Sequence, residues 1–258
     1  MQLRNAEASS GRPLTARSVV ASTLLGTEPP VLPGRVLVRA AALFGISEGA
    51  TRVALSRMVS GGEVSTDDGL YRLTGPRLLN RQARQTASRL AVTKRWRGRW
   101  VLAIVTAERR DAAARSALRD RLGAARLAEL REGVWTRPDN IDVAWPDVVT
   151  EHGTIVTDAV MDTSLAPVLW DLDAWSAHAT ALREDMAELV RPLDDGDTTA
   201  LAAGFVTSAA VLRHLQADPL LPAALLPGDW PGAALRAEYD RFDAAYRAVL
   251  RDWFRSNL

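Results

Sequence analysis

Residues 45–73 carry a pattern that few folds satisfy. Gly45 permits a sharp turn, and the Ser47 hydroxyl is suited to accept an orphan backbone N–H at the start of a helix. A helical repeat follows, and then two short strand-like runs separated by Asp68-Gly69, which is a strong signal for a two-residue hairpin. Turn, helix and hairpin in this order predict a winged helix-turn-helix.

The predicted helix of this segment has two contrasting faces. The inward residues repeat at helical spacing and are Thr51, Ala54, Leu55 and Met58. The outward residues are small, hydroxylated or basic, with one exposed valine, and are Gly49, Arg52, Val53, Ser56, Arg57 and Ser60. A helix in a DNA major groove needs such a face, because arginine forks to guanine or grips phosphate and an apolar group touches the thymine methyl. The plainer interpretation is an amphipathic helix followed by a hairpin.

We therefore expect a set of contacts to double-stranded DNA. From the helix we expect Arg52, Val53, Ser56 and Arg57. Ser47 would cap the helix and meet a phosphate, while Arg72 on the wing and Arg17 on an earlier helix would grip the backbone.

Charge is divided unevenly along the chain. Residues 1–95 hold 14 Lys and Arg against 6 Asp and Glu, a net charge of +8. Residues 96–258 hold 18 against 25, a net charge of −7, so the whole-chain value of +1 conceals the division. Because DNA affinity comes largely from counterion release, the basic first third fits a phosphate-contacting module and the acidic remainder does not.

Composition excludes several classes of protein. The chain has no cysteine, so thiolate chemistry and disulfides are absent. The first residues lack the apolar core of a signal peptide, and the most apolar segment, Ala200–Leu212, is too short to span a bilayer. We expect a cytoplasmic protein with no membrane partner.

No motif for catalysis, metal or cofactor stands out. His152, His178 and His214 do not share a close metal-ligand spacing, and Asp194–Asp197 lacks the full spacing of a calcium loop. Walker, nucleophile-elbow and dinucleotide motifs are missing. We expect no enzyme, no catalytic or metal-binding residues and no cofactor.

The chain divides into four parts. We predict a winged helix-turn-helix over 1–74, a basic linker helix over 75–95, an α+β domain over 96–165 and a helical domain over 166–258. In the first part we expect a helix over 14–25, capped by Thr15, a loop over 29–34 and a helix over 35–44.

The α+β domain is expected to be ferredoxin-like. Its predicted strands are 100–105, 127–130, 133–136 and 153–157, with a helix over 108–122 after the first. The last part is predicted to hold helices over 168–189, 198–216 and 232–254, separated by Pro192, Asp194–Asp197 and the 219–231 stretch.

Several stretches carry a resemblance to a known family. They are Thr15–Ser18, Leu24–Gly26, Leu43–Glu48, Leu55–Met58, Tyr71–Thr74, Arg97–Trp100, Leu118–Leu122, Gly133–Pro138 and Leu225–Gly232. In their order and spacing the chain, from about residue 14 to 250, resembles the PaaX-type transcriptional repressors of bacterial phenylacetate catabolism.

This resemblance implies a fold and a set of partners. The fold would be a winged helix, a ferredoxin-like middle domain similar to a CRISPR spacer-acquisition nuclease, and a helical C-terminal domain. A homodimer would bind a near-palindromic operator and release it on binding phenylacetyl-coenzyme A or a related acyl-coenzyme A. The effector pocket is not placed by the sequence, although Trp135 and Trp170 are aromatic candidates for it. The linker helix 77–92, with the domain after it, is expected to transmit effector binding to the DNA-binding part.

Two other functions stay open. A metal-dependent nuclease would use the middle domain, but Thr106-Ala107-Glu108 at the end of its first strand lacks the aspartate that the nuclease relatives use. An interaction protein of the same fold without operator binding draws support from the acidic wing turn Asp67-Asp68-Gly69.

Overall fold

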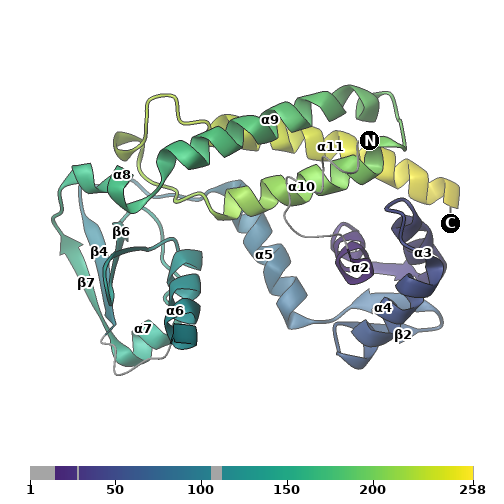
Figure 1. The fold of residues 1–258 in the computed structure, drawn as a ribbon, viewed down its shortest axis with the longest axis horizontal. Coiled ribbons are helices and arrows are strands. Elements are labelled where there is room, and N and C mark those ends of the chain that lie inside the picture. The colour runs from purple at the N-terminus through teal and green to yellow at the C-terminus, as the bar shows by residue number, and fades with distance from the viewer. Residues whose placement is uncertain (1–14, 28, 106–111, 258) are drawn as a thin grey trace. The chain divides into compact units, whose positions relative to one another are not determined.

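The computed structural model describes residues 15–27, 29–105 and 112–257, which form two compact units (Figure 1). The first unit comprises the described part of Met1–Thr86 together with Ala181–Arg213 and Ala234–Leu258. The second comprises Ala87–Thr180 and His214–Ala233. The chain therefore passes between the units several times, and each unit is built from segments far apart in sequence.

The first unit begins with a winged helix-turn-helix, as the sequence predicts. Its elements are α2 (Ala16–Leu25), β1 (Val31–Pro33), α3 (Gly34–Ala42), α4 (Glu48–Ser60), β2 (Val64–Asp67) and β3 (Leu70–Leu73). The three strands form an antiparallel sheet in the order β1-β3-β2. Thr15 caps α2 in a reciprocal capping box with Ser18, and Gly26 ends the helix.

Strand β1 replaces part of the loop that was expected over 29–34. Val31 to Pro33 pair with Arg72 to Leu70 of the wing. Prolines flank and end this three-residue segment, so its own sequence gives no strand signal. The strand forms because it hydrogen-bonds to the neighbouring β3, and the spacing of residue types along the sequence does not reveal a contact between such distant segments.

The core of the winged helix includes a residue from the opposite end of the chain. Leu24 of α2, Leu37 of α3 and Leu55 of α4 are buried in one cluster, and Phe254 of helix α11 (Gly232–Asn257) lies in the same cluster. Leu250 and Trp253 pack against it. The last helix of the chain is therefore part of the structural support of the DNA-binding fold.

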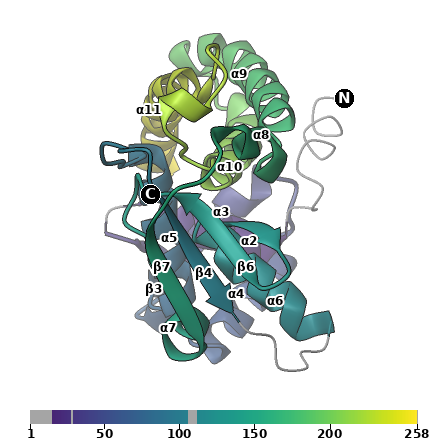
Figure 2. The same ribbon diagram turned by 90° about the vertical axis from the view of Figure 1, so that its left-hand side faces the viewer.

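The second unit contains a ferredoxin-like domain, which confirms the predicted fold class. Its elements are β4 (Trp100–Val105), α6 (Ala112–Ala124), β5 (Ala128–Arg131), β6 (Val134–Pro138), α7 (Asp147–His152) and β7 (Gly153–Ala159). The four strands are antiparallel in the order β5-β6-β4-β7, and Figure 2 shows β4 between β6 and β7. The βαββαβ connection with this strand order is the ferredoxin-like arrangement.

Helix α7 is an element that the sequence interpretation omitted. It begins directly after Pro146 and has Asp147 in its first turn. A carboxylate near the N-terminus suits the helix dipole, so a signal was present, although a six-residue helix is too short to show periodicity.

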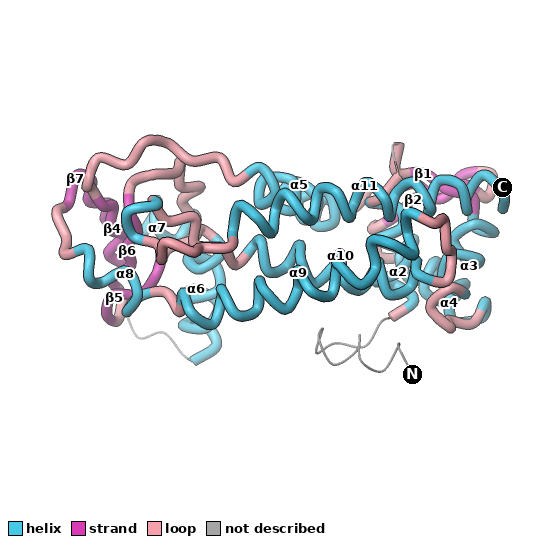
Figure 3. The backbone as a smooth tube through the Cα atoms, turned by 90° about the horizontal axis from the view of Figure 1, so that it is seen from above, coloured by secondary structure: helices cyan, strands magenta, loops and turns pink. Residues whose placement is uncertain are grey.

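The remaining helices are α5 (Pro76–Leu90), α8 (Ala166–Leu169), α9 (Leu172–Asp194), α10 (Ala200–Gln216) and α11, with two short 3₁₀ segments, Thr163–Leu165 and Ala223–Leu225. The Arg183 guanidinium joins α9 to Glu238 of α11 at 2.6 Å, and the hydroxyls of Ser208 and Tyr239 join α10 to α11 at 2.9 Å. Figure 3 shows α9, α10 and α11 running alongside one another. Within the described part of the chain, no helix is both long and apolar enough to cross a membrane.

The helix predicted over 168–189 is wrong at both ends. Trp170 is extended and breaks the segment, after which the Asp171 carboxylate accepts the Ala174 N–H at 3.0 Å and starts α9. At the other end α9 continues past Pro192, which was expected to end it. The turn after Pro192 is closed by hydrogen bonds from Asp195 N to Arg191 O and from Asp197 N to Pro192 O, so the proline is tolerated in the last turn.

Arg137 of β6 is fully buried within the second unit. Its guanidinium donates hydrogen bonds of 2.9–3.4 Å to Oδ1 of Asn140 and to the carbonyl oxygens of Arg126, Pro138, Pro219 and Leu220. Burial, and after it the charge of Arg126, lowers the pKa of Arg137 to about 9, so the guanidinium stays charged at neutral pH. This side chain ties the sheet to the loop that precedes α11.

Candidate nucleic-acid interface

Helix α4 is positioned by its cap and by its buried stripe. Ser47 accepts the Ala50 N–H at 3.3 Å, and the Thr51 hydroxyl donates to the Ser47 carbonyl at 3.0 Å. Thr51, Leu55 and Met58 are buried, as expected. Gly45 has a φ of +70°, which is the left-handed conformation that lets the chain turn sharply between α3 and α4.

The opposite face of α4 is exposed along its length, as predicted. Its residues are Gly49, Arg52, Val53, Ser56, Arg57 and Ser60. Val53 is 52% exposed, so its methyl groups are accessible to a partner. The Ser60 hydroxyl donates back to the Ser56 carbonyl at 3.0 Å.

Arg52 is engaged with Glu48 one turn earlier on α4. Its Nε and Nη2 both lie 2.7 Å from Oε1 of Glu48. The two side chains are 69% and 59% exposed, so this ion pair is worth only a few tenths of a kcal/mol and is easily exchanged for another anion. Arg52 therefore lies on the exposed face of α4 in a weak ion pair, and it can exchange Glu48 for another anion.

Arg17 is bound to Glu63, a residue that the sequence interpretation did not consider. Nε of Arg17 donates to both carboxylate oxygens at 2.9 and 3.1 Å, and Nη2 donates at 2.7 Å. The carbonyl of Glu63 accepts the N–H groups of Thr74 and Gly75 beyond the wing. The pair thus fastens α2 to the base of the wing. A phosphate would have to compete with Glu63 for this guanidinium.

The wing is a short hairpin with the predicted turn. Asp68 and Gly69 have φ values of 44° and 74°, and Asp67 pairs with Leu70 across them. Positive φ at both turn residues is the type I′ geometry that suits the twist of a hairpin. Arg72 lies exposed on β3, and among the described residues neither it nor Arg57 has an ion-pair partner. The turn itself is acidic and exposed.

A hollow of about 310 Å³ lies between α4 and the wing. Arg52 and Ser56 line it from α4, while Thr66 and Tyr71 line it from the wing. Gly34, the first residue of α3, also lines it, and a Cβ at this position would come within 2.8 Å of the Tyr71 ring. The hollow brings the two predicted helix residues together with Thr66 and Tyr71, which the sequence interpretation missed because no local pattern links a wing strand to a helix face.

Comparisons with known proteins agree with this arrangement. Family models match three successive parts of the chain: PaaX-like protein over 15–76, PaaX protein central Cas2-like domain over 93–163, and PaaX-like protein C-terminal domain over 170–256. The chain belongs to the PaaX family. It is thereby a PaaX-like regulator, and the winged helix is the N-terminal domain of that family.

A solved structure supports the same assignment. The uncharacterized protein Rv0674 from Mycobacterium tuberculosis is 43% identical, and the match covers 92% of this chain and 97% of that chain with a TM-score of 0.75. A comparison with curated proteins found no match. The similar structure therefore supports the family and the fold of this chain.

The Cas2-like middle domain raises the question of a metal site. Residues 106–108, where the sequence interpretation noted the missing aspartate, lie outside the described residues. In the part of the chain that the structure describes, no three His, Cys, Asp or Glu side chains are grouped to hold a metal ion. Two of the histidines lie in an aromatic stack, in which the rings of Trp175 and His214 are 4.2 Å apart and those of His178 and His214 are 4.7 Å apart.

The two tryptophans that were candidates for the effector pocket, Trp135 and Trp170, pack against other side chains. Trp135 is buried in the core of the ferredoxin-like domain beside a cavity of only about 20 Å³, which is room for about one water molecule. Trp170 stacks on Trp100 with ring centroids 6.3 Å apart. The cavity beside Trp135 is therefore too small for an effector group.

Proposed function

We propose that this PaaX-family chain is a DNA-binding transcriptional repressor of an aromatic-acid catabolic operon of the phenylacetate type. It would bind double-stranded operator DNA and be released by an acyl-coenzyme A effector. The observation that carries the proposal is the exposed face of α4, which is basic, hydroxylated and small, and which includes the exposed Val53. Membership of a regulator family supports it.

The proposed contacts divide between base reading and backbone gripping. Arg52, Val53, Ser56 and Arg57 would face base edges in the major groove, where arginine reads guanine and valine meets a thymine methyl. Ser47, Arg72 and Arg17 would meet phosphates. Arg17 would do so only by leaving Glu63, whereas Arg72 needs no such exchange. The middle and C-terminal parts, which carry the acidic excess, would stay off the DNA.

Replacing Arg52 by alanine tests the base-reading role. If Arg52 reads a base, we expect the variant to lose roughly 1–3 kcal/mol of operator binding and to discriminate less between sequences. If it also neutralises a phosphate, the slope of log affinity against log salt should flatten by roughly one unit. Fluorescence anisotropy with DNA from the gene's own upstream region, titrated with salt, measures both.

Arg191→Ala is the matched control, because Arg191 is also exposed on a helix and lies 3.9 Å from Asp195 in an i,i+4 ion pair. It should bind like the natural chain. An Arg52→Ala variant with normal affinity and selectivity would remove Arg52 from the interface.

A homodimer would match a near-palindromic operator. Strand β7 lies at the edge of its sheet, and its central residues are exposed, including Ile155 and Val156 at 37% each. An exposed edge strand with apolar side chains is suited to pair with a second chain. We expect Ile155→Lys to shift the molecular mass measured by light scattering from dimer to monomer, while Thr180→Lys, at an exposed position of α9 away from this strand, serves as control. A monomeric natural chain would contradict the dimer.

A further inference from the structure

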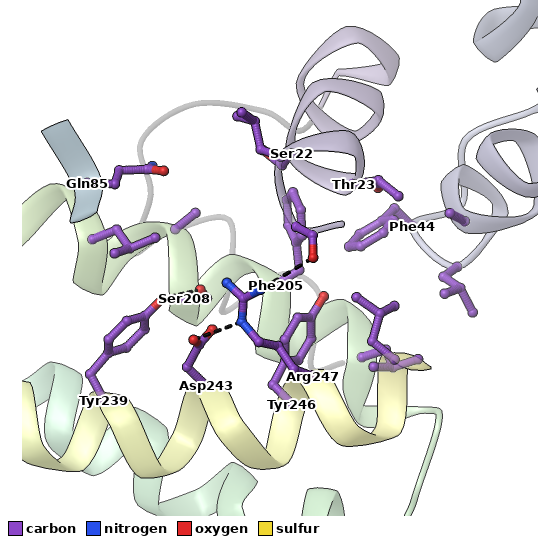
Figure 4. A pocket seen from close by; sticks show the side chains of 18 residues that line it. Ser22, Thr23, Phe44, Gln85, Phe205, Ser208, Tyr239, Asp243, Tyr246 and Arg247 are labelled. Atoms are coloured by element: carbon purple, nitrogen blue, oxygen red, sulfur yellow. Dashed lines mark hydrogen bonds and ion pairs between the residues drawn. The ribbon is translucent and has the colours of Figure 1, made fainter. Parts of the chain in front are cut away.

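A cavity of about 110 Å³ lies inside the first unit, between helices α2 and α3 on one side and α10 and α11 on the other (Figure 4). Leu43 and Phe44 at the end of α3 form one wall, and Phe205 and Leu212 of α10 form another. The rings of Phe44 and Phe205 meet edge to face, with centroids 4.8 Å apart. The cavity is therefore largely apolar and aromatic.

Polar groups gather at one side of this cavity. Nε of Arg247 donates to Oδ2 of Asp243 at 2.9 Å, and Nη1 of Arg247 donates to the Gly26 carbonyl at 3.3 Å. The hydroxyls of Ser208 and Tyr239 lie 2.9 Å apart, and Figure 4 shows both groups among the side chains of the lining. Burial raises the pKa of the nearby Tyr246, so its hydroxyl keeps its proton and can donate a hydrogen bond.

The size and chemistry of the cavity indicate a ligand class. An apolar cavity of about 150 Å³ holds one benzene molecule, so this cavity of about 110 Å³, which opens to the surface, limits the enclosed part of its occupant to no more than one ring. Aromatic walls suit a flat ring, and a guanidinium with adjacent hydroxyls suits a carbonyl oxygen. The carboxylate of Asp243, which is paired with Arg247, disfavours an anionic group at the same place. Ligand pockets commonly combine apolar walls with a few polar groups in this way.

We propose that this cavity binds the aromatic acyl end of the effector, with the ring packed against the side chains of Phe44 and Phe205 and the acyl oxygen toward Arg247. This inference rests on the proposed function and gives the effector a site. The coenzyme part would remain outside the cavity, because a coenzyme A is far larger than one ring.

The position of the cavity explains how its occupant would act on DNA binding. Phe44 immediately precedes Gly45, at which the chain turns into α4. Gly26 is the C-cap of α2, and Arg247 is bonded to it from α11. A ligand that moves Phe44 or breaks the Arg247 contact therefore changes the placement of the DNA-binding helices. It shifts the equilibrium only by its differential affinity for the free and DNA-bound shapes.

The cavity also changes which part of the chain is expected to transmit effector binding to the DNA-binding helices. The sequence interpretation named the linker helix over 77–92 with the domain after it, and of that helix Gln85 lines the cavity. Most of the lining comes from α2, α10 and α11 and from the end of α3. Effector binding would accordingly be transmitted through the contact between the winged helix and the C-terminal helices, to which the linker helix also contributes.

Filling the cavity tests this site without removing a polar group. Ala209 lines it from α10, so Ala209→Leu should occupy part of the space. Ala187→Leu, at an exposed position on α9, is the matched control. Isothermal titration calorimetry with phenylacetyl-coenzyme A on the full chain measures ligand binding in the absence of DNA. We expect Ala209→Leu to weaken binding at least tenfold and Ala187→Leu to leave it unchanged.

A second variant keeps the test decisive if Ala209→Leu fails to fold. Arg247→Gln removes the cation, and we expect it to weaken phenylacetyl-coenzyme A binding at least tenfold while the circular dichroism spectrum is retained. Binding of the thioester with natural affinity by both variants would overturn the site, as would no binding by the natural chain. The repressor function can fail separately. If the natural chain binds the thioester and both variants are impaired, but the natural chain binds no DNA selectively, the site is upheld and the repressor function is overturned.

Discussion

Arg137→Ala is expected to lower the free energy of unfolding of the second unit by about 3–5 kcal/mol. The substitution removes the Arg137 donor from the carbonyl groups of Arg126 and Pro219, and it removes one of two donors from the carbonyl of Leu220, which keeps Nδ2 of Asn140. It also opens a cavity where a fully buried side chain lay. Arg137→Lys should be nearly as damaging, because one ammonium group cannot span acceptors arranged around a planar guanidinium. Urea unfolding followed by tryptophan fluorescence measures the change.

Arg99→Ala is the control for this prediction. Arg99 is exposed beside the same sheet, and removal of its side chain should change the free energy of unfolding by less than about 0.5 kcal/mol. Equal midpoints for Arg137→Ala and Arg99→Ala would mean that the hydrogen bonds of the buried guanidinium do not hold the sheet to the loop before α11.

The double variant Arg52→Ala, Arg57→Ala is expected to weaken operator binding severely. Two arginines that each contribute roughly 1–3 kcal/mol would together account for a weakening of about 30-fold to about 3 × 10⁴-fold. Both side chains are exposed on α4, so the fold should survive their removal. Anisotropy titration at fixed salt gives the affinity, and urea unfolding checks that stability is unchanged.

The control for the double variant keeps the same loss of charge at other places. Arg131→Ala with Arg191→Ala removes two exposed arginines from β5 and α9, and it should bind the operator within about threefold of the natural chain. Similar losses for both double variants would mean that net charge alone governs binding, and would contradict a reading role for α4.

Periodicity and capping residues were enough to predict the candidate interface. Ser47, the buried stripe of α4 and the Asp68-Gly69 turn all depend on residues close together in sequence, and the structure places each as expected. The order of the four strands of the middle domain was also predictable, because β4 is a continuous apolar run and β6 and β7 are bounded by glycine or proline, whereas the short helix α7 was missed.

Contacts between distant segments could not be predicted in the same way. Glu63 holds Arg17 across 46 residues, β1 exists because β3 lies beside it, and Phe254 completes a core begun by α2. The cavity has the same origin, since Phe44 and Phe205 meet only in the folded chain. Local pattern specifies elements and their faces, whereas these features depend on which faces meet.

The most direct test of the central claim is the selectivity of the natural chain for DNA. Anisotropy would be measured with a duplex from the gene's own upstream region and with a scrambled duplex of equal composition, between about 50 and about 200 mM salt. The account predicts that the upstream duplex binds at least about 10³-fold more tightly and that affinity for both duplexes falls steeply with salt. Equal affinity for the two duplexes, or no binding to either, would contradict operator recognition by α4 and would favour an interaction protein of the same fold.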